Sequence, residues 1–406
     1  MPASDRATAL SPTAICAFEN KNTRWPAGKM RCSVGPLKLE ATYRRSHRKR
    51  RQRLLFNDMK KNSPSIFHLL FAGSVGAQFS EGDEGLHVPP ALSAALRAER
   101  FTFDGVSCYA AGSGPPLLLV HSVNAAASAA EMRPIFDRCR ATRTVFAIDL
   151  PGYGFSDRSD RPYTPRVMTD ALHSVAREIQ LRCGDAPIDA LALSLGCEFL
   201  ARAALENPSR WGRLALVSPT GLDRRAARRV PHVGTRFNAA MHAVLSVPLW
   251  ANALFGALTR PSVIRYFLER TWGSKDIDEA SWAYAVKTAR QPGARFAPFH
   301  FIAGGLFSTD IQQVYAKLVQ PVWMSHGMYG DFTDYQGKSM VPALDHWPVT
   351  VFDSGALPYF EEPGEFFAAF SSFIGTNPGS VSPISLHSTA HALPPSMTGR
   401  KWPSAT

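Results

Sequence analysis

The stretch IDALALSLGCEFLARAALE, residues 188–206, changes character after its sixth residue. A mostly apolar run ends at Ser194-Leu195-Gly196, and the sequence then takes on the composition of a helix. This order predicts a strand, a sharp turn and a helix, with Ser194 at the apex of the turn. The G-x-S-x-G turn that exposes a nucleophilic serine needs small residues two positions either side of it. Gly196 meets this requirement and Ala192 meets it more loosely, so an ordinary strand-to-helix turn stays open as an alternative.

Two further apolar runs precede this turn. PLLLVH, residues 116–121, follows a Gly-Ser-Gly-Pro segment, and TVFAIDL, residues 144–150, follows a stretch of helical character at 128–140. Short, continuous apolar runs are typical of strands that are buried on both faces, as in parallel sheets. The second run leads directly into DLPGYGFSD, residues 149–157.

The string DLPGYGFSD, followed by the serine turn, resembles the D-x-P-G-x-G-x-S signature of the α/β-hydrolase superfamily in order and spacing. The resemblance covers about residues 101–375 and is greatest to members with a helical cap, such as epoxide hydrolases, dehalogenases and esterases. It implies an α/β-hydrolase fold, in which a mostly parallel central sheet is flanked by helices and carries an inserted helical cap.

Composition and this resemblance divide the chain into five segments. We expect a basic, disordered N-terminal extension, two parts of a hydrolase-like core, a helical cap between them and an unstructured C-terminal tail rich in Pro, Ser and Thr. Their predicted bounds are 1–88 for the extension, 89–221 and 319–376 for the core, 222–318 for the cap and 377–406 for the tail.

The predicted cap is too long for a plain connection and has helical rather than strand periodicity. Residues 237–259 carry no charge, and this uncharged run is about as long as a membrane helix. Pro248 and the polar residues around it argue against a membrane span, so we expect two cap helices that break at Pro248 and face an apolar pocket. Trp282 is a candidate lining residue of that pocket, although core packing is the alternative.

The net charge of +12 is concentrated at the N-terminus. Residues 1–61 hold 15 Lys or Arg and 4 acids, and the rest of the chain holds 30 and 29. The nearly neutral remainder gives no electrostatic reason to expect a nucleic-acid partner for the folded domain. RRSHRKRRQR, residues 44–53, is compatible with a nucleic-acid module or a nuclear address, but we expect a solvated tail.

The six cysteines show neither metal-ligand spacing nor a disulfide framework, and they predict free thiols in a cytoplasmic protein. Translation from Met59 would instead place two lysines before an uncharged run, as in a secretory signal, and would predict export. No metal site and no cofactor are predicted. The sequence specifies no oligomeric state.

The remaining parts of a Ser-His-acid triad are implied by the family resemblance. GMYGD, residues 327–331, resembles the family's G-x-x-D turn with one extra residue, which implies Asp331 as the orienting acid. Asp334 is the reserve, and Asp223 is an alternative after the preceding strand. SGALPYFEEP, residues 354–363, resembles the terminal G-H-x-P-x-x-E-x-P pattern with Ala356 where the histidine stands.

A serine hydroxyl is a weak nucleophile unless a neighbouring base takes its proton. His326 ends the penultimate predicted strand and is the nearest substitute in topology, although a structural role at the strand end is the alternative. Glu198 lies one turn past Ser194 and could also simply orient the helix. The other candidates belong to the predicted cap: His232, His242 and His300.

The oxyanion donors should be the backbone N–H groups of Leu195 and Val123, with the Asn124 side chain as a third. Ser122 stands where the family commonly has glycine, and His121 before it is expected to be structural.

These patterns predict a hydrolase that acts on a small apolar ester or related acyl substrate through Ser194, with a degenerate triad. The alternative is a catalytically inactive member that binds an apolar ligand or a protein partner.

Overall fold

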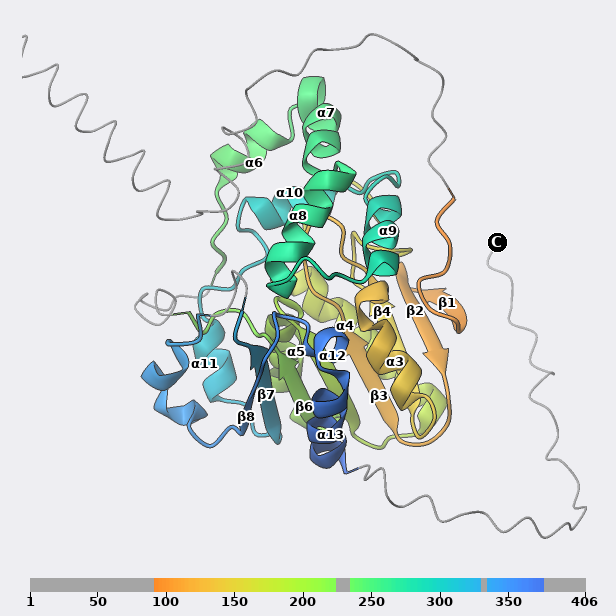
Figure 1. Cartoon of the computed structure of the whole chain (residues 1–406), viewed down its shortest axis with the longest axis vertical. Helices are drawn as coiled ribbons and strands as arrows, with labels where there is room; N and C mark the ends of the chain where they lie inside the picture. The colour runs from red at the N-terminus through yellow and green to blue at the C-terminus, as the bar shows by residue number, and fades with distance from the viewer. Residues whose placement is uncertain (1–90, 224–233, 330–333, 376–406) are drawn as a thin grey trace, which may run out of the picture. The chain divides into compact units, whose positions relative to one another are not determined.

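The computed structural model describes residues 91–223, 234–329 and 334–375. Asp331, His232 and the two predicted terminal segments, 1–88 and 377–406, lie outside the described residues. Figure 1 shows a central twisted sheet with helices on both faces and further helices above its upper edge.

The sheet has eight strands in the order β1-β2-β4-β3-β5-β6-β7-β8. β2 pairs antiparallel with β1 and with β4, and every other pair is parallel. The strand bounds are β1 Glu99–Phe103, β2 Val106–Ala111, β3 Pro116–Val120, β4 Thr144–Asp149, β5 Ile188–Leu193, β6 Trp211–Val217, β7 Val322–Gly327 and β8 Val349–Phe352. The mostly parallel sheet predicted from the sequence is confirmed.

Each face of the sheet buries its own hydrophobic core, because successive strand residues point to opposite sides. Leu118 and Val120 of β3 face a cluster that also contains residues of α4, α5 and α11. Leu117 and Leu119 face a second cluster with residues of α3, α12 and α13. The helices that flank the sheet are α3 Arg133–Cys139, α4 Pro165–Cys183, α5 Gly196–Glu206, α11 Ile311–Ala316, α12 Pro358–Glu361 and α13 Pro363–Ile374.

The turn after β4 is built around the buried carboxylate of Asp149. Its two oxygens accept the backbone N–H groups of Ala129, at 2.8 Å, and of Phe155, at 3.0 Å. Gly154 passes this carboxylate with φ 50°, and a Cβ there would lie 1.9 Å from the Asp149 Cγ. The second glycine of the DLPGYGFSD string is therefore required by the close approach of the turn to Asp149.

The chain between β6 and β7 contains helices that, with their connections, we call the helical insertion. Its helices above the edge of the sheet are α6 Ala239–Leu245, α7 Pro248–Leu258, α8 Pro261–Trp272, α9 Glu279–Thr288 and α10 Phe296–Ile302. Phe255 and Phe299 belong to a small separate core of this segment. A 2.6 Å ion pair between Arg133 of α3 and Asp278, the N-cap of α9, ties the insertion to the sheet domain.

No single helix in the described ranges is long and apolar enough to cross a membrane, although α6 and α7 together pass that test with a bend of 89° between them. The break falls at Pro248, where the sequence predicts it. Four cysteines lie in the described ranges and all four are free thiols: Cys108, Cys139, Cys183 and Cys197.

Candidate active site

Ser194 lies between β5 and α5 with a φ of 54°, in the left-handed region that non-glycine residues seldom adopt. Its backbone N–H donates to the carbonyl of Val217 at 2.9 Å, which continues the sheet pairing into the turn. Gly196 packs directly against the end of β3, because a Cβ there would lie 2.5 Å from the carbonyl oxygen of His121, the residue after the strand. Strained backbone of this kind persists only where neighbours hold it, and it clusters at functional sites.

Two backbone N–H groups, on the elbow and on the loop after β3, are the candidate oxyanion donors. Leu195 is the N-cap residue of α5, and Val123 lies in the loop after β3. Neither N–H donates a hydrogen bond to any described residue. The positive end of the α5 dipole also favours negative charge at this position. The arrangement is the one expected of an oxyanion hole after a serine elbow.

The loop from His121 to Asn124 is fixed by internal hydrogen bonds. The His121 Nε2 accepts the Leu150 N–H at 2.9 Å, so its Nδ1 carries the proton and donates to the Ser122 carbonyl at 2.5 Å. Burial lowers the pKa of His121 to about 4, which keeps the ring neutral. These contacts agree with the structural role expected of this histidine.

Glu131 is a part of the site that the sequence does not reveal. Its carboxylate accepts the backbone N–H of Ser122 at 2.9 Å and the side-chain amide of Asn124 at 3.0 Å. The Asn124 amide also donates to the Ser122 hydroxyl at 3.2 Å, so both of its hydrogens are engaged. The S-x-x-E pattern of Ser128 to Glu131 indicates only a local capping box, in which the glutamate would bond the chain at Ser128.

The elbow belongs to a row of strand ends. Leu193 of β5 pairs with Val217 of β6, which pairs with Ser325 of β7. The next residues along these strands therefore share one edge of the sheet: Ser194, Ser218 and His326. Because adjacent strands lie roughly 5 Å apart, the backbones of Ser194 and His326, two strands apart, are separated by roughly 10 Å.

His326 is held at this edge by two contacts. Its Nδ1 is 2.8 Å from the Gly327 carbonyl and donates to it, and its ring stacks on Tyr335 with centroids 4.1 Å apart. The Tyr335 hydroxyl lies close to the Ser218 hydroxyl. Burial lowers the pKa of His326, so a neutral ring with an unprotonated Nε2 is favoured. Sequence reasoning does not identify Tyr335 or Ser218 as neighbours of this histidine.

Ala356 follows β8 and is only 7% exposed. Its carbonyl accepts the Ser218 hydroxyl at 2.8 Å, and its N–H donates to the Thr271 carbonyl at the end of α8 at 2.8 Å. Ala356 therefore lies within hydrogen-bonding contact of Ser218, the strand-end neighbour of Ser194, and against the helical insertion.

No described imidazole hydrogen-bonds to the Ser194 hydroxyl. His242 and His300 face each other in the insertion, with centroids 4.1 Å apart. Glu198 is fully buried and binds the Thr220 hydroxyl at 2.6 Å and the Ser308 N–H at 2.9 Å. These two bonds occupy both of its carboxylate oxygens in holding the insertion to α5.

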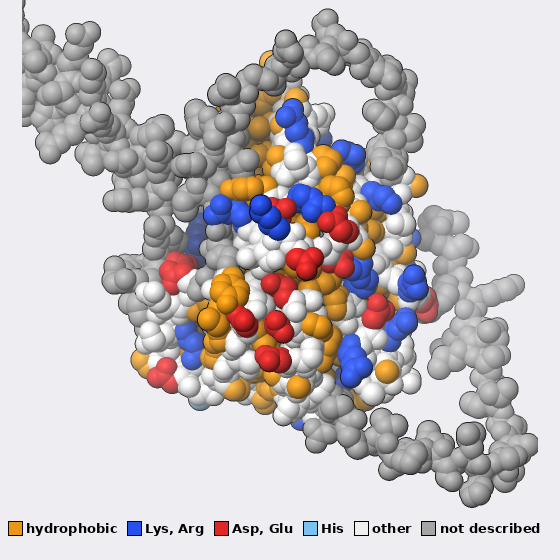
Figure 2. Space-filling model, in the orientation of Figure 1, with side chains coloured by type: hydrophobic (Ala, Val, Ile, Leu, Met, Phe, Trp, Pro, Cys, Tyr) orange, Lys and Arg blue, Asp and Glu red, His pale blue; other side chains and the backbone are white. Residues whose placement is uncertain are grey.

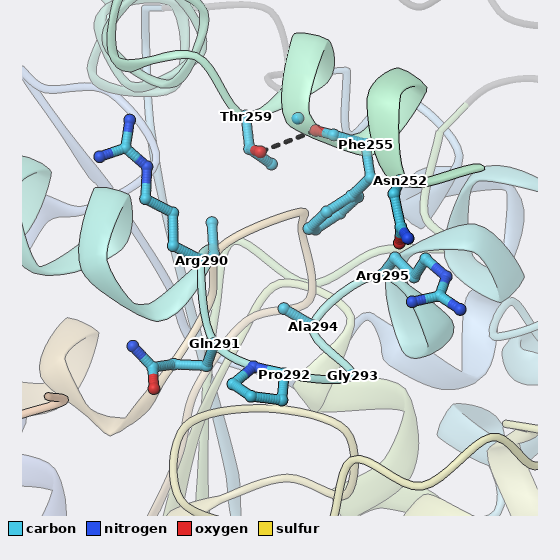
Figure 3. Close-up of a pocket in the computed structure, with 11 residues that line it drawn as sticks. Asn252, Phe255, Thr259, Arg290, Gln291, Pro292, Gly293, Ala294 and Arg295 are labelled. Atoms are coloured by element: carbon cyan, nitrogen blue, oxygen red, sulfur yellow. Dashed lines mark hydrogen bonds between the residues drawn. The ribbon is translucent and has the colours of Figure 1, made fainter. Parts of the chain in front are cut away.

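Trp282 joins two helices of the insertion. Its indole N–H donates to the Pro261 carbonyl at 3.0 Å, and Arg265 of α8 lies over its ring at 4.5 Å. Elsewhere in the insertion, a cleft of about 270 Å³ lies between α7 and the loop that joins α9 to α10 (Figure 3). No residue that lines this cleft belongs to the row of strand ends. Within the described ranges, no cluster of three or more His, Cys, Asp or Glu could hold a metal ion.

Comparison with known proteins gives matches by family and by structure. A family model described as the alpha/beta hydrolase fold matches residues 115–363. No curated protein matches the chain by sequence.

Three solved structures illustrate the structural likeness. The enol-lactonase from Burkholderia xenovorans LB400 has a TM-score of 0.51 and 17% identity, covering 68% of this chain and 100% of that one. The carboxylesterase CesB from Bacillus subtilis has a TM-score of 0.51 and 16% identity, covering 70% and 93%. A serine hydrolase involved in carbazole degradation has a TM-score of 0.51 and 16% identity, covering 67% and 95%. At these identities the likeness concerns the fold.

Proposed function

This chain belongs to the α/β-hydrolase fold family, and from that premise we propose that it hydrolyses a small apolar ester or a related acyl compound through Ser194. The observation that carries the proposal is the strained Ser194 backbone beside the N–H groups of Leu195 and Val123, which have no acceptor among the described residues. A carbonyl carbon placed next to the serine hydroxyl would put its oxygen at these two donors.

The proposed chemistry is acyl transfer in two stages. The Ser194 Oγ attacks the ester carbonyl, its proton passes to a base, and the oxyanion is stabilised by the two backbone N–H groups. The C–O bond to the alcohol then breaks, and the alcohol leaves with that proton. Water attacks the acyl-serine in the same way and releases the acid, which restores Ser194.

We propose His326 as the base and Asp331 as the orienting acid, the latter because it stands at the acid position of the family's G-x-x-D turn. Three features support His326: its place in the row of strand ends, its Nδ1–H bond to Gly327, and the free Nε2 that this bond leaves. The roughly 10 Å between the two backbones is a span that the serine and histidine side chains can bridge only when turned toward each other. Because no hydrogen bond joins them in the described structure, we expect slow turnover.

The test is covalent labelling combined with turnover. Purified full-length protein should react with a fluorophosphonate at Ser194 and hydrolyse part of a panel of short and medium acyl esters. Ser194→Ala should abolish both, and His326→Gln should lower turnover by roughly a hundredfold or more. His346→Gln is the matched control, because His346 is exposed and makes none of the site's contacts. Absence of labelling together with absence of turnover across the panel would overturn the proposal.

A second function is a non-catalytic member that binds an apolar ligand or a protein partner at the same site. It is favoured by Ala356 at the position where the resemblance has histidine, and by the Ser194 hydroxyl, which has no hydrogen-bonded base among the described residues. Turnover that Ser194→Ala abolishes would exclude this function.

A further inference from the structure

The helical insertion carries an apolar face that the fold leaves uncovered by described residues. Four large hydrophobic side chains of α6, α7 and their flanks are exposed there, and we call them the apolar face: Phe237 at 44%, Val244 at 60%, Leu249 at 87% and Trp250 at 43%. Residues 237–259 contain no Lys, Arg, Asp or Glu. A concentration of exposed apolar side chains of this kind marks an interaction site.

Cations border this face. Arg260 is the N-cap of α8, two residues after the end of α7, and Arg290 and Arg295 line the cleft beside α7 (Figure 3). None of the three forms an ion pair with a carboxylate of the described residues, and no acidic residue lines the cleft. We call these three residues the arginine rim. Figure 2 shows hydrophobic side chains at the upper end of the molecule, where α7 lies in Figure 1, close to Lys and Arg side chains.

From this arrangement we propose that the helical insertion docks on an anionic membrane surface, with α6 and α7 lying in the interface and the arginine rim binding lipid phosphates. Helices with an apolar face and flanking cations bind in this way, with the apolar side chains immersed at the headgroup boundary. The 89° bend between α6 and α7 prevents a straight span but lets both helices lie along one surface.

Two observations favour a lipid surface over a second copy of the chain. A symmetric dimer would bring the same patch of both copies together, so the arginines of one copy would lie near the arginines of the other and repel them. Trp250 also suits a membrane interface, because its indole N–H already donates to the Val244 carbonyl at 2.9 Å. Its ring can therefore enter an apolar layer without leaving a donor unpaired.

The experiment is sedimentation of the full-length protein with vesicles, either of phosphatidylcholine alone or of an equal mixture with phosphatidylglycerol. Residues 1–61 are strongly basic and are the same in every variant, so any contribution they make to vesicle binding cancels when variants are compared. Leu249→Asp should lower partitioning into both vesicle types by roughly tenfold or more. Arg290→Gln with Arg295→Gln should lower it by roughly tenfold on the anionic vesicles alone.

The matched controls lie on α4, outside the insertion. Leu181 is 83% exposed and Arg177 is exposed without a described ion pair, so Leu181→Asp and Arg177→Gln should leave partitioning unchanged. Leu249→Asp should fold, since its side chain is 87% exposed and an acid suits the first turn of α7.

The proposal is overturned if Leu249→Asp partitions as the unmodified protein does. It is also overturned if Leu249→Asp only converts a dimer to a monomer in light scattering, which would identify a second copy as the occupant. Ser194→Ala should not change partitioning, so failure of the docking proposal and failure of the proposed hydrolysis can be told apart.

Discussion

Replacing Ala356 by histidine should raise ester turnover, if the site lacks only its base. Ala356 is fixed at both ends of its peptide unit, by Thr271 and by Ser218, and Ser218 is the strand-end neighbour of Ser194. The Ala356 backbone therefore contacts the row that contains the serine at Ser218, which lies roughly one strand spacing, about 5 Å, from Ser194. We expect an imidazole at this position to approach the Ser194 hydroxyl.

The expected gain follows from general-base catalysis. A positioned base contributes on the order of a hundred- to ten-thousand-fold in rate, which corresponds to about 3–5 kcal/mol of activation free energy. The position is 7% exposed, so a larger side chain should lower the free energy of unfolding by about 1–3 kcal/mol. The gain and the loss are measured separately, by ester turnover and by thermal unfolding.

The assay compares Ala356→His with Ala356→Asn, which adds bulk and polarity without a base of suitable pKa. The gain should occur only with histidine, should vanish in the double variant with Ser194→Ala, and should increase with pH through about 6.5, as the imidazole loses its proton. A folded Ala356→His protein with no more turnover than Ala356→Asn would refute the idea that only the base is missing.

Three further predictions concern stability and are measured by denaturant unfolding. Gly196→Ala should lower the free energy of unfolding by about 1–3 kcal/mol because of the 2.5 Å approach to the His121 carbonyl, whereas Gly364→Ala, with nothing within 4 Å, should be neutral or stabilising; equal effects would contradict this account. Asp189→Asn should cost about 3–5 kcal/mol, because it leaves Arg143, 2.7 Å away and 4% exposed, as a buried charge without its carboxylate; a loss below 1 kcal/mol would argue against it. The pKa of His121 in the folded protein lies below its unfolded value, so its contribution to the free energy of unfolding is fully present above pH 6.5 and declines by about 3 kcal/mol toward pH 4. The difference in free energy of unfolding between the unmodified protein and His121→Gln should therefore narrow from pH 6.5 to pH 4. A difference that stays constant over this range would contradict the assignment.

The fold could be predicted from the sequence because its signals are local. The apolar run before Ser194, the small residue at 196 and the helical stretch after it each fix one element, and the structure has them at β5, the elbow and α5. Pro248 likewise predicts the break between α6 and α7, since proline cannot continue a helix.

The surroundings of the site could not be predicted, because they depend on which loops meet. The sequence around Glu131 indicates the end of a capping box, yet its carboxylate accepts the backbone N–H of Ser122 in another loop. Tyr335 lies far along the chain from Ser218, and only the order of the strands brings its hydroxyl to that residue. The spacing of residues in the sequence carries no information on such tertiary contacts between distant segments.

The strain at Ser194 is weaker evidence for catalysis than the backbone donors beside it. A left-handed serine costs about 1–3 kcal/mol, but the Val217 carbonyl and the contact of Gly196 with β3 would hold that conformation in an inactive protein too. The N–H groups of Leu195 and Val123 differ, because unpaired donors of buried residues are costly unless a ligand accepts from them. An acyl carbonyl bound without reaction would satisfy them as well as a transition state does. Covalent labelling of Ser194 is therefore the measurement that separates hydrolysis from binding.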